Sequence, residues 1–338
     1  MPGTDPLLLD EISLLLVWTA VAIYVLAFIA YAIDLARRSD LAIKAKDEVV
    51  ARELVTAGGG GVIDASPRSS ASGPSSAQPR YLWARMGTAL VALGFLFHLA
   101  GTVLRGVAAG RVPWSNMYEF ALTGVLLVVA VYLVVLTRFD LRFLGALITG
   151  LAIVLLGGAT LAFHVEVVPL ADPLKSVWLV IHVFVASLAT ALFALAFGLS
   201  VMQLLQTRRE RKLALAASSD APAPRRSFLQ TLPNADALES LAYRFAIVGF
   251  IFWTFTLIAG SIWANDAWGR FWGFDTKEVW TFVIWVLYAG YIHARATRGW
   301  RGTRSAWLSI IGFAAVLFNF TIVNVFFKGL HAYSGLTT

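Results

Sequence analysis

Long apolar runs alternate with short polar segments over most of this chain. A helix that crosses a bilayer core of about 30 Å needs about 20 predominantly apolar residues. Eight runs reach or approach that length: 12–35, 86–106, 119–137, 143–163, 177–205, 245–263, 279–294 and 306–327. The pattern therefore predicts an all-α polytopic membrane protein with about eight transmembrane helices.

Basic residues decide which way these helices face. Short cytoplasmic loops carry an excess of Lys and Arg. If the N-terminus is outside, the inner segments hold 21 of the 27 Lys and Arg residues and the outer segments hold 6. The stretch before the first run carries acids and no base, so it does not read as a signal peptide. We expect both termini to be extracytoplasmic.

Polar segments divide the chain into three parts. Residues 1–37 form the expected N-terminal transmembrane helix, 38–85 a cytoplasmic linker, and 86–338 a core of seven helices. The linker is expected to be partly disordered, because 58–79 is rich in Gly, Ser and Pro. The basic stretch 208–227 is expected to lie near anionic lipid headgroups.

Composition agrees with the membrane interpretation and narrows the chemistry. The chain is 59% hydrophobic and 14% charged, whereas soluble domains have roughly 25% charged residues. It has no cysteine, which excludes disulfides, thiolate metal sites and CxxC redox chemistry. The net charge of +7 follows from the topology, and nothing indicates nucleic-acid binding. The five histidines are the remaining soft ligands.

An aromatic segment, "WGRFWGFDTKEVW" at 268–280, joins the sixth and seventh runs. An interfacial aromatic belt would account for one or two of its tryptophans. It does not account for the glycines and charges set between them. We therefore expect a tryptophan-rich external loop, in which Trp268, Trp272 and Trp280 form a flat platform.

Two histidines fall on the face of this loop. His182 lies five residues into the fifth run, roughly 8 Å below the outer boundary, and His331 lies just past the last run. One such histidine often bonds a neighbouring helix, but two beside an aromatic loop favour a ligand site. Zinc, copper and haem all remain open. Zinc usually takes three or four ligands, whereas haem takes one or two and an apolar pocket. The candidate partners for haem carboxylates are Arg111, Arg270, Lys277 and Lys328.

Two further histidines lie deeper. His293 is roughly 20 Å below the outer boundary and His98 roughly 18 Å above the inner one, so their heights differ by roughly 8 Å. One metal needs its opposite ligands only about 4 Å apart, since metal–nitrogen bonds are near 2 Å. His293 is thus the stronger candidate for an intramembrane ligand, and His98 is a possible second one.

The aromatic segment is similar to a known signature. "WANDAWGRFWGFDTKEVW" at 263–280 resembles the tryptophan-rich WWD signature of haem-handling membrane proteins. Four other stretches resemble the CcsA (or ResC) family of cytochrome c biogenesis proteins of the system II pathway: "GRVPWSNMYE", "KSVWLVIHV", "LYAGYIHAR" and "GLHAYSG". The resemblance covers about residues 86–338. Phe274 replaces the third tryptophan, Thr276 replaces a proline, and Arg111 stands where histidine is frequent.

The resemblance implies a function in cytochrome c maturation at the bacterial plasma membrane. The chain would bind haem b and present it, or export and present it, at the outer face. There, with a CcsB/ResB-type membrane partner, it would serve attachment to CxxCH motifs of apocytochrome c, as one subunit of a cytochrome c synthase. The implied haem ligands are His182 and His331 outside and His293 in the membrane, the last paired with a partner histidine or His98. The other implied haem-binding residues are Trp263, Trp268, Trp272, Phe274, Asp275 and Trp280.

Two other classes of protein remain as alternatives. A haem-containing electron-transfer subunit would place histidine pairs at matched depths on facing helices. A haem-free transporter would have spans broken by Gly or Pro and charges near the midplane.

Overall fold

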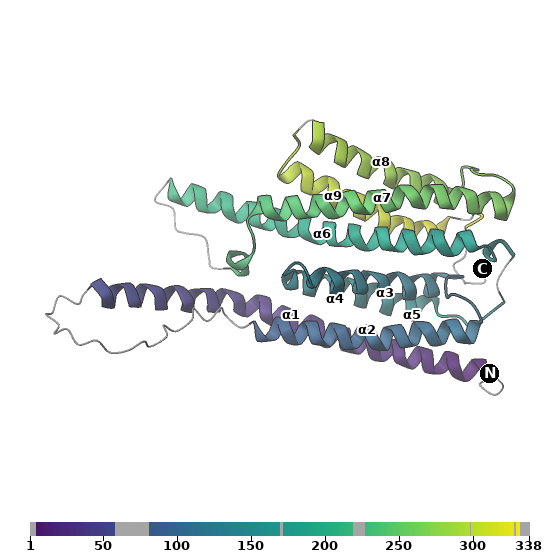
Figure 1. Ribbon diagram of the computed structural model, residues 1–338, viewed down its shortest axis with the longest axis horizontal. Coiled ribbons are helices and arrows are strands. Elements are labelled where there is room, and N and C mark those ends of the chain that lie inside the picture. The colour runs from purple at the N-terminus through teal and green to yellow at the C-terminus, as the bar shows by residue number, and fades with distance from the viewer. Residues whose placement is uncertain are drawn as a thin grey trace, which may run out of the picture.

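The helices of this protein run side by side as one elongated bundle (Figure 1). The computed structural model describes residues 5–57, 81–169, 172–218, 227–297, 299–327 and 329–331. Throughout these ranges every regular element is helical and no strand occurs. The prediction of an all-α polytopic membrane protein is confirmed.

Seven long helices form the bundle. They are α1 (Pro6–Ala57), α2 (Leu82–Ala109), α3 (Met117–Leu136), α6 (Val177–Ala217), α7 (Ala235–Trp268), α8 (Thr276–Thr297) and α9 (Thr303–Phe318). A further span is assembled from η1 (Arg142–Leu144), α4 (Gly145–Ala152), η2 (Ile153–Gly157) and α5 (Gly158–Phe163). The remaining short elements are η3 (Asp172–Leu174), η4 (Phe228–Thr231), η5 (Asn319–Val323) and α10 (Asn324–Phe326). In Figure 1, α6 to α9 form one half of the bundle and α1 to α5 the other.

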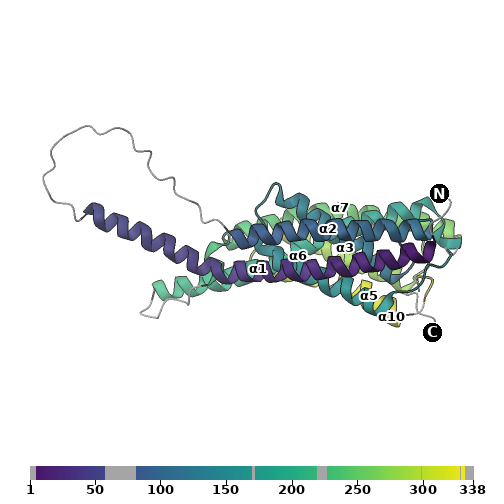
Figure 2. The same ribbon diagram turned by 90° about the horizontal axis from the view of Figure 1, so that it is seen from below.

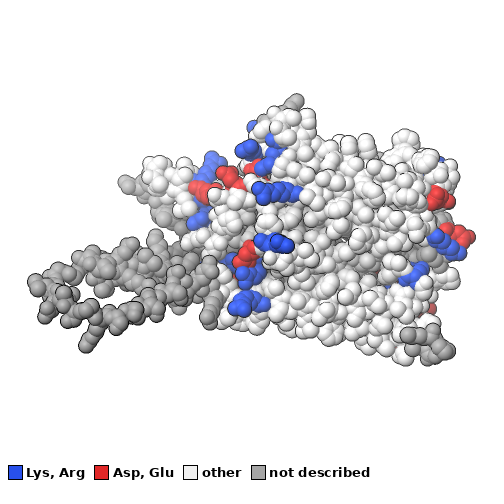
Figure 3. All heavy atoms as spheres, in the orientation of Figure 1, with Lys and Arg blue, Asp and Glu red and all other residues white. Residues whose placement is uncertain are grey.

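The helices have the length and the apolar surface of membrane spans. Within the described residues, 7 helices are long and apolar enough to cross a bilayer. The remaining expected span, 279–294, corresponds to α8, whose 22 residues would extend roughly 33 Å, although its tryptophans, tyrosines and charges lower its hydropathy. That span stays a prediction. Figure 3 shows charged side chains near the two ends of the visible face and a largely uncharged belt between them.

Two spans contain a π-helical segment. η2 interrupts the span between α4 and α5, and η5 follows α9 before α10. Such π-bulges occur frequently at functional sites. Both segments border the larger cavity described below, through Leu155, Asn319 and Phe320.

Helix α1 belongs to the core of the bundle. It lies along α2, and its Tyr24 and Tyr31 side chains are fully buried. The two helices approach so closely that a Cβ at Gly94 would come within 2.7 Å of the Tyr24 ring. The expected division between 1–37 and 86–338 is therefore not a packing boundary. The helix also continues to Ala57, into the expected linker, whereas 58–79 lies outside the described residues.

A buried ion cluster fastens α1 at one end of the bundle. The fully buried Arg105 donates to Asp10 at 2.6 Å, to Glu119 at 3.1 Å and to the Val165 carbonyl at 2.9 Å. These partners come from α1, α3 and the segment after α5. Arg111 also donates to Glu119, at 2.6 Å.

One end of the bundle, called the site end below, carries the start of α1, the connection between α7 and α8, and residues 329–331 (Figure 1). At the opposite end α1 extends well beyond the other helices (Figure 2). Placement of the site end outside the membrane rests on the distribution of basic residues and stays a prediction.

Candidate functional site

The site begins with the tight connection between α7 and α8. Helix α7 ends at Trp268, and Gly269 follows in the left-handed conformation at φ 69°, which glycine adopts readily. Asp275 then caps α8, because its carboxylate accepts the Lys277 N–H at 3.3 Å. In return, Glu278 accepts the Asp275 N–H at 3.1 Å. This reciprocal pair is a capping box, and it explains the acids of the "DTKE" stretch.

Glu278 also shapes the loop before the helix. It accepts the Gly273 N–H at 2.8 Å and pairs with Arg270 at 3.3 Å. Phe274 is 80% exposed and has φ 57°, a positive value that no other non-glycine residue among the described ones adopts. The loop is thus held in a specific and partly strained form.

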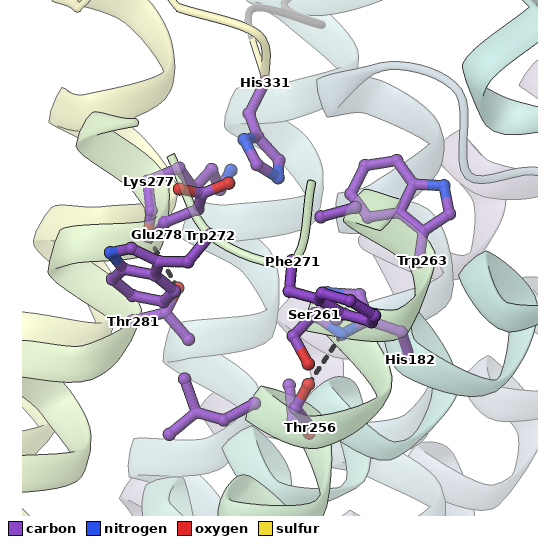
Figure 4. Close-up of a pocket in the computed structure, with 13 residues that line it drawn as sticks. His182, Thr256, Ser261, Trp263, Phe271, Trp272, Lys277, Glu278, Thr281 and His331 are labelled. Carbon is purple, nitrogen blue, oxygen red and sulfur yellow. Dashed lines mark hydrogen bonds between the residues drawn. The ribbon is translucent and has the colours of Figure 1, made fainter. Parts of the chain in front are cut away.

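A pocket opens beside this loop. It contains about 500 Å³ of empty space, its open mouth included. Its lining comes from α6, α7, the loop, α8 and the segment after α10: His182, Thr256, Leu257, Gly260, Ser261, Trp263, Ala264, Phe271, Trp272, Lys277, Glu278, Thr281 and His331. Figure 4 shows Trp263 on one side of it and Trp272 with Lys277 on the other. The two outer histidines therefore share one aromatic pocket, although 149 residues of sequence separate them.

The tautomer of His182 follows from its hydrogen bond. Its Nδ1 lies 2.9 Å from the Thr256 carbonyl of α7. A carbonyl only accepts, so Nδ1 donates, and in the neutral ring Nε2 keeps the lone pair. Gly260, four residues after Thr256, makes this contact possible, because a Cβ there would lie 2.7 Å from His182 Cε1.

His331 is held in the same manner by a charged partner. Its Nδ1 lies 2.7 Å from Asp275 Oδ2, and the carboxylate accepts. This hydrogen bond holds the pKa of Asp275 below its ordinary value, against the opposing effect of burial. Across the described part of the chain, no hydrogen bond occupies Nε2 of His182 or of His331. In the neutral form, each ring therefore presents one nitrogen lone pair at Nε2.

Trp263 connects the two histidines. Its indole stacks with the His182 ring at 6.0 Å and 22°, and meets His331 nearly edge-on at 5.4 Å and 67°. Trp268 meets His331 edge-on at 4.8 Å. Trp263 is 2% exposed, so these rings form a fixed wall.

The expected flat platform of three tryptophans is not present. Trp272 lines the pocket, whereas Trp268 is not among the residues that line it. Trp280 lies 4.5 Å from Phe318 of α9 and is not among the pocket residues. Trp280 lies in the second turn of α8, which starts at Thr276, and its side chain there faces α9 and not the pocket. The aromatics of the segment form walls and supports instead of a shelf.

The structure separates the two deeper histidines. His98 is fully buried in α2, with Nδ1 3.3 Å from the Tyr24 hydroxyl and Nε2 2.8 Å from the Leu122 carbonyl. His293 is exposed on α8, and α2 and α8 lie in opposite halves of the bundle (Figure 1). The geometry does not bring His98 and His293 to one iron.

Of the four basic residues considered for haem carboxylates, Lys277 lines the pocket and its Nζ bonds Asn324. Arg270 is paired with Glu278, and Arg111 with Glu119. Lys328 lies outside the described residues. Lys277 is therefore the cation best placed for an anionic group in the pocket.

A second cavity adjoins the first. It contains about 910 Å³ and shares His182, Thr256, Lys277 and Thr281 with the first pocket. Its remaining walls are mostly apolar side chains of α3, α6, α9 and the two π-helical segments. The site thus opens both at the end of the bundle and into the apolar interior. Sequence reasoning identified neither this cavity nor Thr256, Gly260 and Thr281, because no local pattern marks them.

Within the described residues, no group of three or more His, Cys, Asp or Glu side chains is arranged to hold a metal ion. The donor set of the pocket is two imidazoles. A porphyrin supplies four nitrogens itself, so its iron needs only one or two axial ligands from the protein. Two imidazole lone pairs, aromatic walls and one cation fit a haem.

Residues 114–331 match the family described as Cytochrome C assembly protein. The chain is 33% identical over 270 residues to "Cytochrome c biogenesis protein CcsA" of Trieres chinensis, covering 74% of this chain and 86% of the relative. The protein of that name in Guillardia theta is 33% identical over 260 residues, covering 74% and 85%. A solved structure, "Cytochrome c Heme Lyase CcmF", superposes with a TM-score of 0.59 at 16% identity, covering 95% of this chain and 47% of that one. At this identity the likeness concerns the fold.

Proposed function

Because the chain belongs to the Cytochrome C assembly protein family, we propose that it binds haem b and presents it for covalent attachment to apocytochrome c. The observation that carries this proposal is the paired geometry of His182 and His331. Each donates through Nδ1 to a fixed acceptor, and each leaves Nε2 available in one aromatic pocket. Two such nitrogens are the axial ligands that a haem iron takes.

The remaining pocket residues fit the rest of the haem. Trp263, Phe271 and Trp272 supply apolar walls for the macrocycle, and Lys277 supplies a cation for a propionate. Trp268 packs edge-on against His331, and Trp280 packs against Phe318 between α8 and α9. Phe274 is 80% exposed at the end of the loop, where an incoming peptide meets it first.

The attachment reaction needs orientation more than acid or base chemistry. A cysteine S–H adds across a haem vinyl group: the sulfur–carbon bond forms, the proton goes to the other vinyl carbon, and no net oxidation occurs. The chain holds the iron through two histidines and fixes the plane by its aromatic walls, which is catalysis by positioning. The histidine of the CxxCH peptide then replaces one axial histidine. The chain has no cysteine of its own to compete.

A partner membrane protein of the CcsB/ResB type fits the position of His293. This histidine lies exposed on α8, so a helix of another chain can bring a second ligand to it. His98 instead keeps both ring nitrogens within its own bundle. We propose that His293 binds haem in the membrane with a partner histidine, and that the second cavity gives haem access to the outer site.

We place the protein in the bacterial plasma membrane with the site end extracytoplasmic. The uneven distribution of Lys and Arg supports this orientation. Apocytochrome c then meets the pocket on the outer side.

Maturation of a reporter cytochrome c, in cells that carry each variant together with the partner, tests the function. His182→Ala and His331→Ala should each abolish maturation, and added imidazole should partly restore it by filling the vacant axial position. His293→Ala should lower the haem content of the purified protein. His164→Ala is the matched control, because His164 packs against Tyr118 outside the pocket. Wild-type maturation by both outer-histidine variants without imidazole would refute the proposed site.

A further inference from the structure

The carboxylate of Asp275 contacts a segment 55 residues further along the chain. Its Oδ1 accepts the Leu330 N–H at 3.0 Å, and its Oδ2 accepts His331 Nδ1 at 2.7 Å. The Asp275 side chain is 8% exposed, so water competes little for these bonds. One side chain thus caps α8 and holds both the backbone and the ring of the segment that carries His331.

The surrounding contacts show that this crossing is closely fitted. A Cβ at Gly329 would collide with the Asp275 carboxylate, so glycine allows the segment to pass directly over it. Two residues after Asp275, the Lys277 ammonium bonds Asn324 at the start of α10. The beginning of α8 and the end of the last span are therefore joined at two adjacent points.

From this geometry we propose that Asp275 is the positioning residue of His331. Its negative charge makes His331 the stronger electron-pair donor to the haem iron of the two outer histidines. The inference rests on the proposed haem site. A carboxylate behind a metal-bound histidine fixes the tautomer and ring orientation, and it raises the basicity of the ligating nitrogen. His182 has only the neutral Thr256 carbonyl in that place. The two histidines therefore differ in how strongly they would donate electrons to the iron.

Helix capping alone does not account for the arrangement. A cap needs one oxygen to accept an N–H of the first turn, and Asn caps a helix about as well as Asp. Asp275→Asn therefore preserves the cap and an acceptor for His331 but removes the charge. Asp275→Ala removes the cap, the acceptor and the charge together. The pair separates the structural role from the role toward His331.

The test uses purified protein with its partner and compares Asp275→Asn, Asp275→Ala and Gly329→Ala. Asp266→Asn is the control, because Asp266 lies at the same end, is exposed and bonds only Ser176 among the described residues. The measured quantities are the haem dissociation constant, the reduction potential of the bound haem and its absorption spectrum.

Asp275→Asn should keep the spectrum of a haem with two histidine ligands, but its reduction potential should rise, because a less basic ligand stabilises ferric iron less. Asp275→Ala and Gly329→Ala should weaken haem binding by about 10- to 100-fold, with partial recovery in imidazole. Asp266→Asn should match the wild type. If all three test variants match Asp266→Asn in affinity, potential and spectrum, the assignment of Asp275 is wrong.

His331→Ala separates this inference from the function beneath it. If His331→Ala loses haem while the Asp275 and Gly329 variants do not, only the positioning role is overturned. If His331→Ala itself binds haem as the wild type does, the proposed haem site is overturned as well.

Discussion

The substitution Gly260→Ala should disable the site without touching any proposed ligand. Gly260 lies inside the C-terminal half of α7, and a Cβ there would come 2.7 Å from Cε1 and 2.8 Å from Nδ1 of His182. Ordinary contacts to a Cβ begin at 3.4 Å. The imidazole would therefore have to move by roughly 0.7 Å, and a misplacement of about 1 Å can cost about 100-fold in a positioned reaction.

The stability of the protein should change much less than its function. Alanine in place of glycine favours a helix by about 1 kcal/mol. Loss of the His182–Thr256 hydrogen bond costs about 0.5–1.5 kcal/mol, and a strained rotamer of the displaced ring costs about as much. The losses equal or exceed the gain, so the free energy of unfolding in detergent should fall by no more than about 2 kcal/mol.

The assay compares Gly260→Ala with Gly158→Ala in haem content, in reporter maturation and in thermal unfolding. Gly158 is helical and nothing lies within 4 Å of a Cβ built on it, so its substitution tests the helix effect alone. Gly260→Ala should resemble His182→Ala in haem loss and in rescue by imidazole. If it binds haem and matures the reporter as well as Gly158→Ala does, the contact between Gly260 and His182 does not control the site.

Three other predictions concern stability and its pH dependence. Arg105→Met should lower the free energy of unfolding by about 3–5 kcal/mol, because it leaves the Asp10 carboxylate without its arginine and leaves Glu119 with Arg111 alone. Arg142→Met, at a half-exposed pair with Asp140, should cost less than about 1 kcal/mol; equal losses in denaturant titrations would contradict this. The lowered pKa of Asp275 stabilises the folded state fully above the ordinary carboxyl pKa of about 3.9, and this contribution is lost as the pH falls through the lower folded value. Asp275→Asn should therefore flatten the decline of the melting temperature below about pH 4, and an unchanged decline would argue against the bond to His331. Phe274→Gly should raise the melting temperature, since it relieves a left-handed backbone costing about 1–2 kcal/mol at an 80% exposed side chain; a lower melting temperature would show that the ring contributes packing.

The position of each residue along the long axis of the bundle was predictable from the sequence. The number of apolar runs gives the number of helices, and the ends of each run give their approximate limits. The position of a residue within its run gives its depth in the membrane. Counting alone therefore placed His182 and His331 at the same end as the aromatic segment. Counting also placed His293 in the opposite half of the bilayer. The family was identified separately, through motifs that keep their order along the chain.

The sequence did not determine how each helix is rotated or which helices are neighbours. Depth says nothing about rotation, which is set by packing between segments far apart in the chain. Packing turned Trp280 toward Phe318 and away from the pocket. It also buried His98 against Tyr24.

The acceptors behind the two histidines were equally beyond the reach of sequence patterns. Thr256 and Gly260 lie in an unremarkable apolar run, and they matter only because α6 and α7 pack closely enough for His182 to reach a carbonyl. The partner of His331 is the capping residue of another helix. Hydropathy fixed where each residue lies along the membrane normal, and only close packing across the bundle fixed which nitrogen each histidine leaves free.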